Sequence, residues 1–220
     1  MKKTLRSIMI PGILISLIFL GGCAGSKTYL LNFHYDATHL SPLLPKTAKP
    51  VQLVVYQFQD VRPDRLYLGR RVYRDGAVDF FKPDAGTVEQ VVTDSVAKAV
   101  EKAGFQVTRA KRHLDPEKEA FESIPGDVAL GGKIERLWVE AKTGIATTDT
   151  DAKARLRIYW GFSKDRVWVT KTIEADAQEK DRPLYNAQDA EKKINEVFRD
   201  AVDRMLKGDT SLKEQLLKIR

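Results

Sequence analysis

Few side chains of this sequence have the types and spacing that catalysis or metal binding requires. The three histidines, His34, His39 and His113, lie far apart, and none belongs to a spaced metal motif. No Gly-x-Ser-x-Gly, His-Glu-x-x-His or phosphate-loop motif occurs, and the carboxylates are scattered along the chain. We therefore expect a protein that is not an enzyme and that has no catalytic residue, metal or cofactor.

Cys23 is the only cysteine, and it follows a short apolar segment near the amino terminus. Lys2, Lys3 and Arg6 give this segment a positive start, and residues 8–20 are mostly apolar. This order, with small residues before the cysteine, is typical of a secretory signal. A membrane-spanning helix is the alternative, but thirteen residues span only roughly 20 Å of a hydrocarbon core of about 30 Å.

Leu20-Gly21-Gly22-Cys23 resembles the lipobox of bacterial lipoproteins. The resemblance implies cleavage of residues 1–22, a thioether-linked diacylglycerol on Cys23 and usually an acyl chain such as palmitate on the new amine. One chain binds a membrane with K of only about 10⁴ M⁻¹, whereas two or more give stable anchoring. Ala24, not Asp, follows the cysteine, which by analogy indicates the outer membrane and its periplasmic face. Lipidation leaves no free thiol for a disulfide, a metal or a nucleophile.

Charge and composition limit the partners of this chain. The formal charge of +7 includes three basic residues of the signal, so the mature chain would carry +4. A basic balance in general favours nucleic-acid binding, but an exported protein does not meet that partner. We expect the membrane, through the lipid anchor, and an envelope protein as partners, and no nucleic acid.

Hydrophobic periodicity predicts the elements that must position any site. The predicted strands cover residues 29–35, 51–58, 69–73, 105–110, 127–142, 152–162 and 167–173. The apolar phase of strand 127–142 shifts by one residue, which predicts a β-bulge near Glu135-Arg136. Thr87-Val88-Glu89-Gln90 has the form of a capping box before a helix that ends at Gly104. Asn186 can cap a second helix, which ends at Gly208.

These elements predict an α+β fold, a two-layer sandwich of two main helices on a mixed, mostly antiparallel sheet. The strand–helix–strand unit over residues 51–110 accounts for one parallel pair. We divide the chain into a cleaved lipoprotein signal (1–22), a lipidated amino terminus with the first strand and a linker (23–50), a single α+β domain (51–208) and a tail (209–220).

Several segments in this order resemble the YajG-type lipoproteins over nearly the whole mature chain. The matching segments are Val54-Val55-Tyr56-Gln57-Phe58, Asp60-Val61-Arg62-Pro63, Leu68-Gly69, Glu101-Lys102-Ala103-Gly104-Phe105 and Asp127-Val128-Ala129-Leu130-Gly131-Gly132-Lys133-Ile134. A similar layout occurs in the amino-terminal domain of TolB and in lipoprotein partners of lipid-transport ABC systems. The resemblance implies a periplasm-facing binding or assembly role without catalytic residues.

Two short segments contain candidate interaction residues. Asp60 and Arg62 follow a predicted central strand, where functional loops often lie. The alternative for this pair is a turn-fixing carboxylate and a surface ion pair, worth under about 1 kcal/mol. Phe80 and Phe81 lie in a predicted loop over residues 79–82 and are either buried under the first helix or part of an exposed contact patch.

Three tryptophans, Trp138, Trp160 and Trp168, lie on predicted strands, and we expect them to pack in the core or on the sheet surface. A ligand groove formed by Trp168 and Tyr159 is an alternative.

The favoured hypothesis is a non-enzymatic envelope lipoprotein, anchored by lipidated Cys23 and acting as a periplasm-facing binding or assembly module. One alternative is an auxiliary lipoprotein of a lipid-transport or ABC-type system, which would need an apolar groove between helices and sheet. Another is a periplasmic hydrolase, which would need convergent acid and base residues in a pocket.

Overall fold

The computed structural model describes residues 25–40, 50–207, 214–215 and 218. The predicted signal, Cys23, the Gly208 helix end, nearly all of the 41–50 linker and most of the tail lie outside these residues. The elements, in chain order, are β1 (Thr28–Leu31), β2 (Gln52–Gln57), β3 (Gln59–Asp60), β4 (Gly69–Val72), β5 (Val78–Pro83), α1 (Val88–Lys102), β6 (Gln106–His113), the 3₁₀ turn η1 (Phe121–Ser123), β7 (Val128–Thr143), β8 (Thr148–Phe162), β9 (Val167–Arg182) and α2 (Ala187–Lys207).

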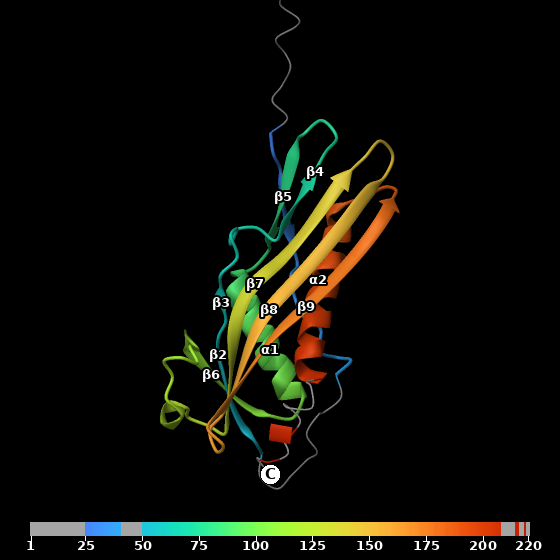
Figure 1. Ribbon diagram of the computed structural model, residues 1–220. Coiled ribbons are helices and arrows are strands. Elements are labelled where there is room, and N and C mark those ends of the chain that lie inside the picture. The colour runs from blue at the N-terminus through green and yellow to red at the C-terminus, as the bar shows by residue number, and fades with distance from the viewer. Residues whose placement is uncertain (1–24, 41–49, 208–213, 216–217, 219–220) are drawn as a thin grey trace, which may run out of the picture.

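Strand β7 organises a nine-stranded mixed sheet. Along one side it pairs in parallel with β2, β3 and β4 in turn, and along the other it pairs antiparallel with β8. Strand β6 extends the sheet from β2, β5 and β1 extend it from β4, and β9 extends it from β8. Figure 1 shows β7, β8 and β9 as long, twisted neighbours that run along most of the molecule. The predicted α+β fold is confirmed.

The sheet has more parallel pairs than the one that was predicted. The expected β2–β6 pair is present, but β1 also runs parallel to β5, and three short strands run parallel to β7. The sequence indicates neighbours mainly for hairpins and for strand–helix–strand units, since these connections constrain topology. Pairing between β4 and β7, which are far apart in the chain, leaves no such local signal.

Both helices cover the same face of the sheet (Figure 1), and the predicted caps at Thr87, Gly104 and Asn186 are confirmed. The Thr87 hydroxyl accepts a hydrogen bond from the Gln90 amide at 3.2 Å, and the Gln90 side chain accepts one from the Thr87 amide at 3.0 Å. Gly104, with φ of 106°, follows the end of α1. The Asn186 side chain accepts from the amides of Gln188 and Asp189 at the start of α2.

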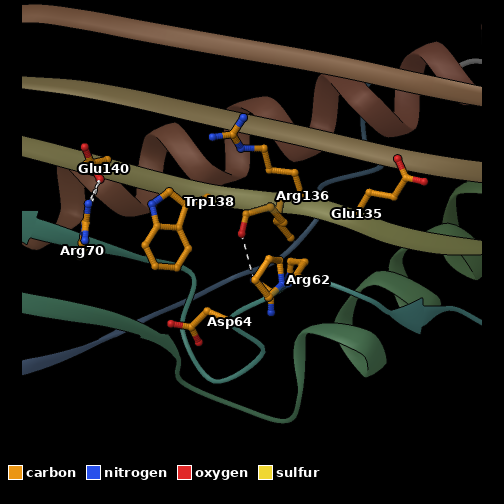
Figure 2. A pocket seen from close by; sticks show the side chains of 9 residues that line it. Arg62, Asp64, Arg70, Glu135, Arg136, Trp138 and Glu140 are labelled. Carbon is orange, nitrogen blue, oxygen red and sulfur yellow. Dashed lines mark hydrogen bonds and ion pairs between the residues drawn. The ribbon is translucent and has the colours of Figure 1, made fainter.

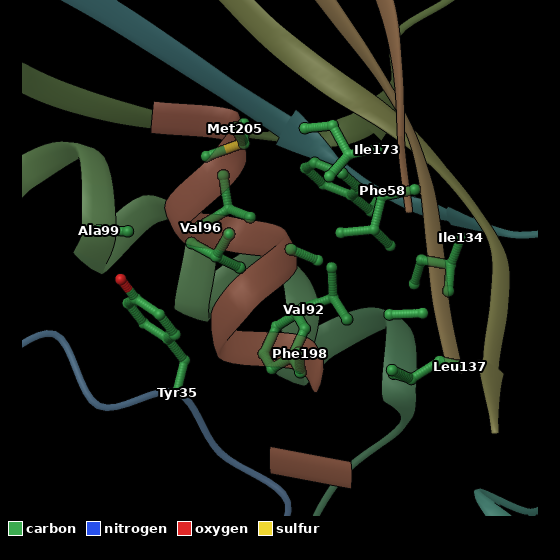
Figure 3. Packing of buried hydrophobic residues seen from close by; sticks show 14 of the residues in the cluster. Tyr35, Phe58, Val92, Val96, Ala99, Ile134, Leu137, Ile173, Phe198 and Met205 are labelled. Carbon is green, nitrogen blue, oxygen red and sulfur yellow. The ribbon is translucent and has the colours of Figure 1, made fainter. Parts of the chain in front are cut away.

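Apolar side chains fill the layer between helices and sheet (Figure 3). Ile134 and Leu137 of β7 are fully buried together with Val92 of α1 and Phe198 of α2. The segment after β1 adds Phe33, whose ring lies 4.8 Å from that of Phe198. Burial of one such side chain contributes about 1.5–3 kcal/mol, so the amino-terminal segment is an integral part of this core.

Several predicted boundaries are wrong. The strand predicted over residues 29–35 ends at Leu31, and the strand predicted from residue 152 begins at Thr148. Residues 79–82 form part of strand β5 instead of a loop, and β9 continues to Arg182 instead of ending near Ile173. The apolar face of the β9 extension consists of Ala175 and Ala177, which alternate with charged or amide side chains. Small apolar residues between exposed charges give a weak strand pattern, because β-branched and aromatic residues carry most of that signal.

Candidate functional site

The predicted β-bulge lies in the middle of β7, on the sheet face that the helices leave uncovered. The pairing with β8 shifts register between Ile134 and Arg136, as the change of apolar phase predicted. Ile134 and Leu137 are both buried in the core, while Glu135 is partly exposed and Arg136 is exposed. The bulge therefore places two successive charged side chains away from the core.

A loop over residues 61–68 lies beside this bulge and is fixed by the predicted pair of Asp60 and Arg62. Asp60 is 9% exposed and Arg62 only 3% exposed, so the pair is buried and the predicted surface ion pair is wrong. The Arg62 side chain donates from both Nε and Nη2 to the two carboxylate oxygens of Asp60 at 2.9 Å. Its remaining guanidinium hydrogens go to the backbone carbonyls of Tyr67, Leu137 and Arg65.

Arg62 therefore uses all five of its N–H donors inside the protein. Asp60 also accepts from the Arg62 backbone amide at 3.1 Å. A fully bonded guanidinium has no donor left for a ligand, so the pair positions the loop and does not itself bind a partner. The chain folds this way because a buried charge is tolerated only when it is paired and hydrogen-bonded.

A groove of about 380 Å³, which we call the Trp138 groove, lies between this loop, β4 and the bulged part of β7. Trp138 forms its apolar part, and the charged residues that line it are Arg62, Asp64, Arg70, Glu135, Arg136 and Glu140. Figure 2 shows Trp138 between the Arg70–Glu140 pair on one side and Arg136 on the other, with Asp64 on the loop below it. The volume is within the range of about 300–1,000 Å³ that is usual for ligand sites.

Close packing of β4 against β7 forms one wall of the groove. Gly69 of β4 pairs with Val139 of β7, and a Cβ atom at position 69 would lie only 1.9 Å from the Val139 carbonyl oxygen. Glycine is therefore required at this close approach. The next pair in the register, Arg70 and Glu140, forms an ion pair across the strands at 2.8 Å.

Most of the charges at the groove already have protein partners. Burial alone would raise the pKa of the Glu140 carboxyl, but hydrogen bonds from Arg70 and Lys142 lower it below its ordinary value. Asp64 accepts hydrogen bonds from two backbone amides of its own loop. Glu135 pairs with Arg155 at 2.9 Å and with Arg157 at 2.7 Å on β8.

Arg136 differs from its neighbours. It is exposed, and it forms no ion pair with the residues that the structure describes. A guanidinium can bind a carboxylate through two parallel hydrogen bonds, and the Trp138 ring offers apolar surface beside it. The groove thus suits non-covalent recognition of an acidic group that neighbours an apolar or planar one.

The other candidate residues are not at the groove. Phe81 is 1% exposed and belongs to the core, whereas Phe80 is partly exposed and stacks on Tyr67 at 4.5 Å between ring centroids. Neither forms a loop patch, because β5 places them on opposite faces of a paired strand.

The alternative groove between Tyr159 and Trp168 is occupied by the protein itself. Trp168 stacks on Phe121 of η1 at 5.1 Å, and Tyr159 is buried in the same small cluster. His34, His39 and His113 are all exposed, and each bonds to a different part of the surface. Within the described ranges, no group of His, Cys, Asp and Glu side chains could hold a metal ion.

Sequence reasoning missed Trp138, Arg136 and Asp64 as members of one site. The bulge and the loop after Asp60 were both predicted, but their adjacency depends on the parallel pairs of β3 and β4 with β7. The predicted bulge was the one available signal, because bulges often occur next to functional sites.

Comparisons with known proteins do not identify this chain. No protein-family model and no curated protein matches it. A solved structure described as a putative neuraminyllactose-binding hemagglutinin homolog from Helicobacter pylori is similar at a TM-score of 0.46 and 12% identity, with 85% of this chain and 96% of that chain covered. The lipoprotein GNA1162 from Neisseria meningitidis gives a TM-score of 0.34 and 12% identity, with 70% and 100% covered.

These similarities are too low to support a statement about function. The resemblance to the YajG-type lipoproteins likewise stays a prediction. In the part of the chain that the structure describes, no helix is both long and apolar enough to span a membrane.

Proposed function

We propose that this protein is a non-enzymatic, lipid-tethered binding module of the bacterial envelope and that the Trp138 groove contacts its protein partner. The observation that carries the proposal is the exposed Arg136 beside Trp138, both presented by the β7 bulge on the uncovered face of the sheet. Tryptophan and arginine are the residue types most enriched among energetically dominant interface residues.

The tether is the lipid on Cys23. The signal segment and the lipobox-like sequence support it, and the outer membrane, facing the periplasm, is the proposed location. The order of motifs that resembles the YajG-type lipoproteins supports the same placement.

The chemistry of the groove favours binding over hydrolysis. A general acid or base needs a pKa near the working pH, but the pKa of Glu140 is lowered below its ordinary value. Asp64 is engaged with backbone amides. The lipid-carrier alternative would need an apolar groove between helices and sheet, where Val92, Leu137 and Phe198 are packed with no exposure.

In-cell photo-crosslinking tests the proposal. A photoreactive amino acid replaces Pro63, an exposed residue that lines the groove, and in a second strain it replaces the exposed Thr108 of β6. We expect a discrete adduct with an envelope protein from position 63 and none from position 108.

The adduct must depend on the groove residues. Trp138→Ala or Arg136→Ala removes an expected dominant contact worth about 2 kcal/mol or more, which corresponds to about 30-fold weaker binding. Lys111→Ala, at an exposed position of β6 outside the groove, is the matched control and should leave the adduct intact. An adduct that persists in the first two variants, or the same adduct from position 108, would show that the groove is not the contact.

A further inference from the structure

The start of the described chain and three loops lie at one end of the sheet. The Lys27 amide donates to Asp79 at the start of β5, next to the β4–β5 turn. Val78 of β5 pairs with Val72 of β4, and Val72 in turn pairs with Lys142 near the end of β7. Thr148 at the start of β8 pairs with Arg182 at the end of β9. Figure 1 shows that this end also contains the β7–β8 turn and the β9–α2 connection.

Two of these loops end in large apolar side chains. Ile145 in the β7–β8 turn is 86% exposed, and Leu184 in the β9–α2 connection is 95% exposed. They are the most exposed large hydrophobic residues of the described chain. Transfer of these exposed side chains from water into an apolar phase would be favourable.

Aromatic rings lie close to the same loops. Arg71 lies over the rings of both Tyr73 and Tyr185, at 4.6 and 4.8 Å from the ring centroids. Tyr73 precedes the β4–β5 turn and Tyr185 follows Leu184 directly. The Tyr73 hydroxyl donates to Asp79 at 2.6 Å and the Tyr185 hydroxyl is buried, so both rings support the loops from within the protein.

The tether length connects this end to the bilayer. Gly25, the first described residue, is two residues from Cys23, and two residues span at most about 7 Å. A headgroup layer is roughly 5–7 Å thick on each side of the hydrocarbon core. A lipid on Cys23 would therefore hold Gly25 within or beside the headgroups.

We infer that this end of the sheet lies on the bilayer and inserts Ile145 and Leu184 into its interface. The inference rests on the proposed lipid anchor at Cys23 and adds a fixed orientation to it. A tether alone would let the domain rotate freely, whereas two apolar loop tips and the anchor define three points of attachment.

The charges of this end agree with a lipid surface. Lys27, Arg74 and Lys180 are exposed and form no ion pair with the described residues. Arg182 pairs with Glu179 and Asp189, and Lys142 pairs with Glu140. The carboxylates of Asp75 and Asp149 accept hydrogen bonds from backbone amides. Anionic lipid should therefore strengthen the contact, although the apolar tips do not require it.

This orientation also determines how far the Trp138 groove lies from the membrane. Trp138 precedes Thr143, the last residue of β7, by five residues, which is about 17 Å along a strand. The groove would thus stand clear of the headgroups and remain open to a partner in the periplasm.

Site-specific fluorescence tests the orientation. Since Cys23 is the only natural cysteine and its sulfur would be in a thioether, Ile145→Cys or Leu184→Cys adds the only free thiol of the lipidated full chain. Each is labelled with an environment-sensitive nitrobenzoxadiazole dye and reconstituted in vesicles of phosphatidylethanolamine and phosphatidylglycerol. Asp165→Cys, in the exposed β8–β9 turn at the other end of these strands, is the matched control.

We expect the emission at positions 145 and 184 to shift to shorter wavelengths and to be quenched by spin-labelled lipid, and the emission at position 165 to stay that of a dye in water. Protein that floats with the vesicles but gives the same aqueous emission at all three positions overturns the orientation and leaves the anchor intact. Protein whose amino-terminal peptide carries no lipid, and which does not float, overturns both. Membrane-like emission at 145 and 184 without a crosslink from position 63 supports the orientation and refutes the partner groove.

Discussion

Asp60→Ala should be one of the most destabilising substitutions in the domain, although it removes few atoms. It leaves Arg62, 3% exposed, without the carboxylate that accepts two of its five hydrogen bonds. The three backbone carbonyls that take the other hydrogens do not neutralise the charge. In the Asp60→Ala variant, Arg62 is thus a buried cation without a counter-ion.

The expected magnitude follows from this burial. Removal of one partner of a buried ion pair typically costs about 3–5 kcal/mol, because the remaining charge is uncompensated. An exposed pair is worth only about 0–1 kcal/mol. The matched control is Glu140→Ala, which removes the partner of Arg70, a side chain that is 46% exposed.

Urea unfolding of the mature domain, followed by circular dichroism, measures both variants against the wild type. We expect Asp60→Ala to lose about 3–5 kcal/mol of unfolding free energy and Glu140→Ala to lose about 1 kcal/mol or less. Equal losses in the two variants would refute the reasoning, since they would mean that Arg62 reaches solvent as readily as Arg70 does.

Three further predictions concern the sheet, the first helix and one titrating group. Gly69→Ala should cost about 1–3 kcal/mol in urea unfolding, because its Cβ would lie 1.9 Å from a carbonyl oxygen of β7, whereas Gly144→Ala should be nearly neutral. Thr87→Ala removes the cap of α1 and should lower the unfolding free energy by about 1 kcal/mol, and a neutral result would refute the capping box. Burial and the hydrogen bond to Asp79 raise the pKa of Tyr73 to about 12. The neutral phenol is the form that the fold favours, so its contribution to stability is complete below pH 10.0 and is lost as the pH rises through about 12. Ultraviolet titration of the wild type against Tyr73→Phe measures this, and a phenol that titrates with its ordinary pKa would contradict it.

The helices and the bulge could be predicted because their signals are local. The capping box at Thr87, the glycine at 104 and the 3.6-residue spacing of apolar residues all lie within one segment. The bulge near Glu135 appears as a shift of apolar phase within a single strand. Such features follow from short-range geometry, so one sequence is sufficient.

The groove could not be predicted, because it depends on contacts between distant segments. Arg70 and Glu140 are 70 positions apart and meet only through the parallel pair of β4 and β7. The burial of Arg62 has the same cause, since the sequence spacing of Asp60 and Arg62 is compatible with an exposed turn as well. The guanidinium of Arg62 also bonds to the carbonyl of Leu137, which is 75 positions away in the chain.

Mass spectrometry of the amino-terminal peptide from the native protein tests the central claim most directly, since both the binding role and the orientation depend on the lipid tether. The account predicts a peptide that begins at Cys23 and carries the mass of a diacylglycerol, together with an added acyl chain on its amine. An unmodified peptide that begins at Met1 would contradict it.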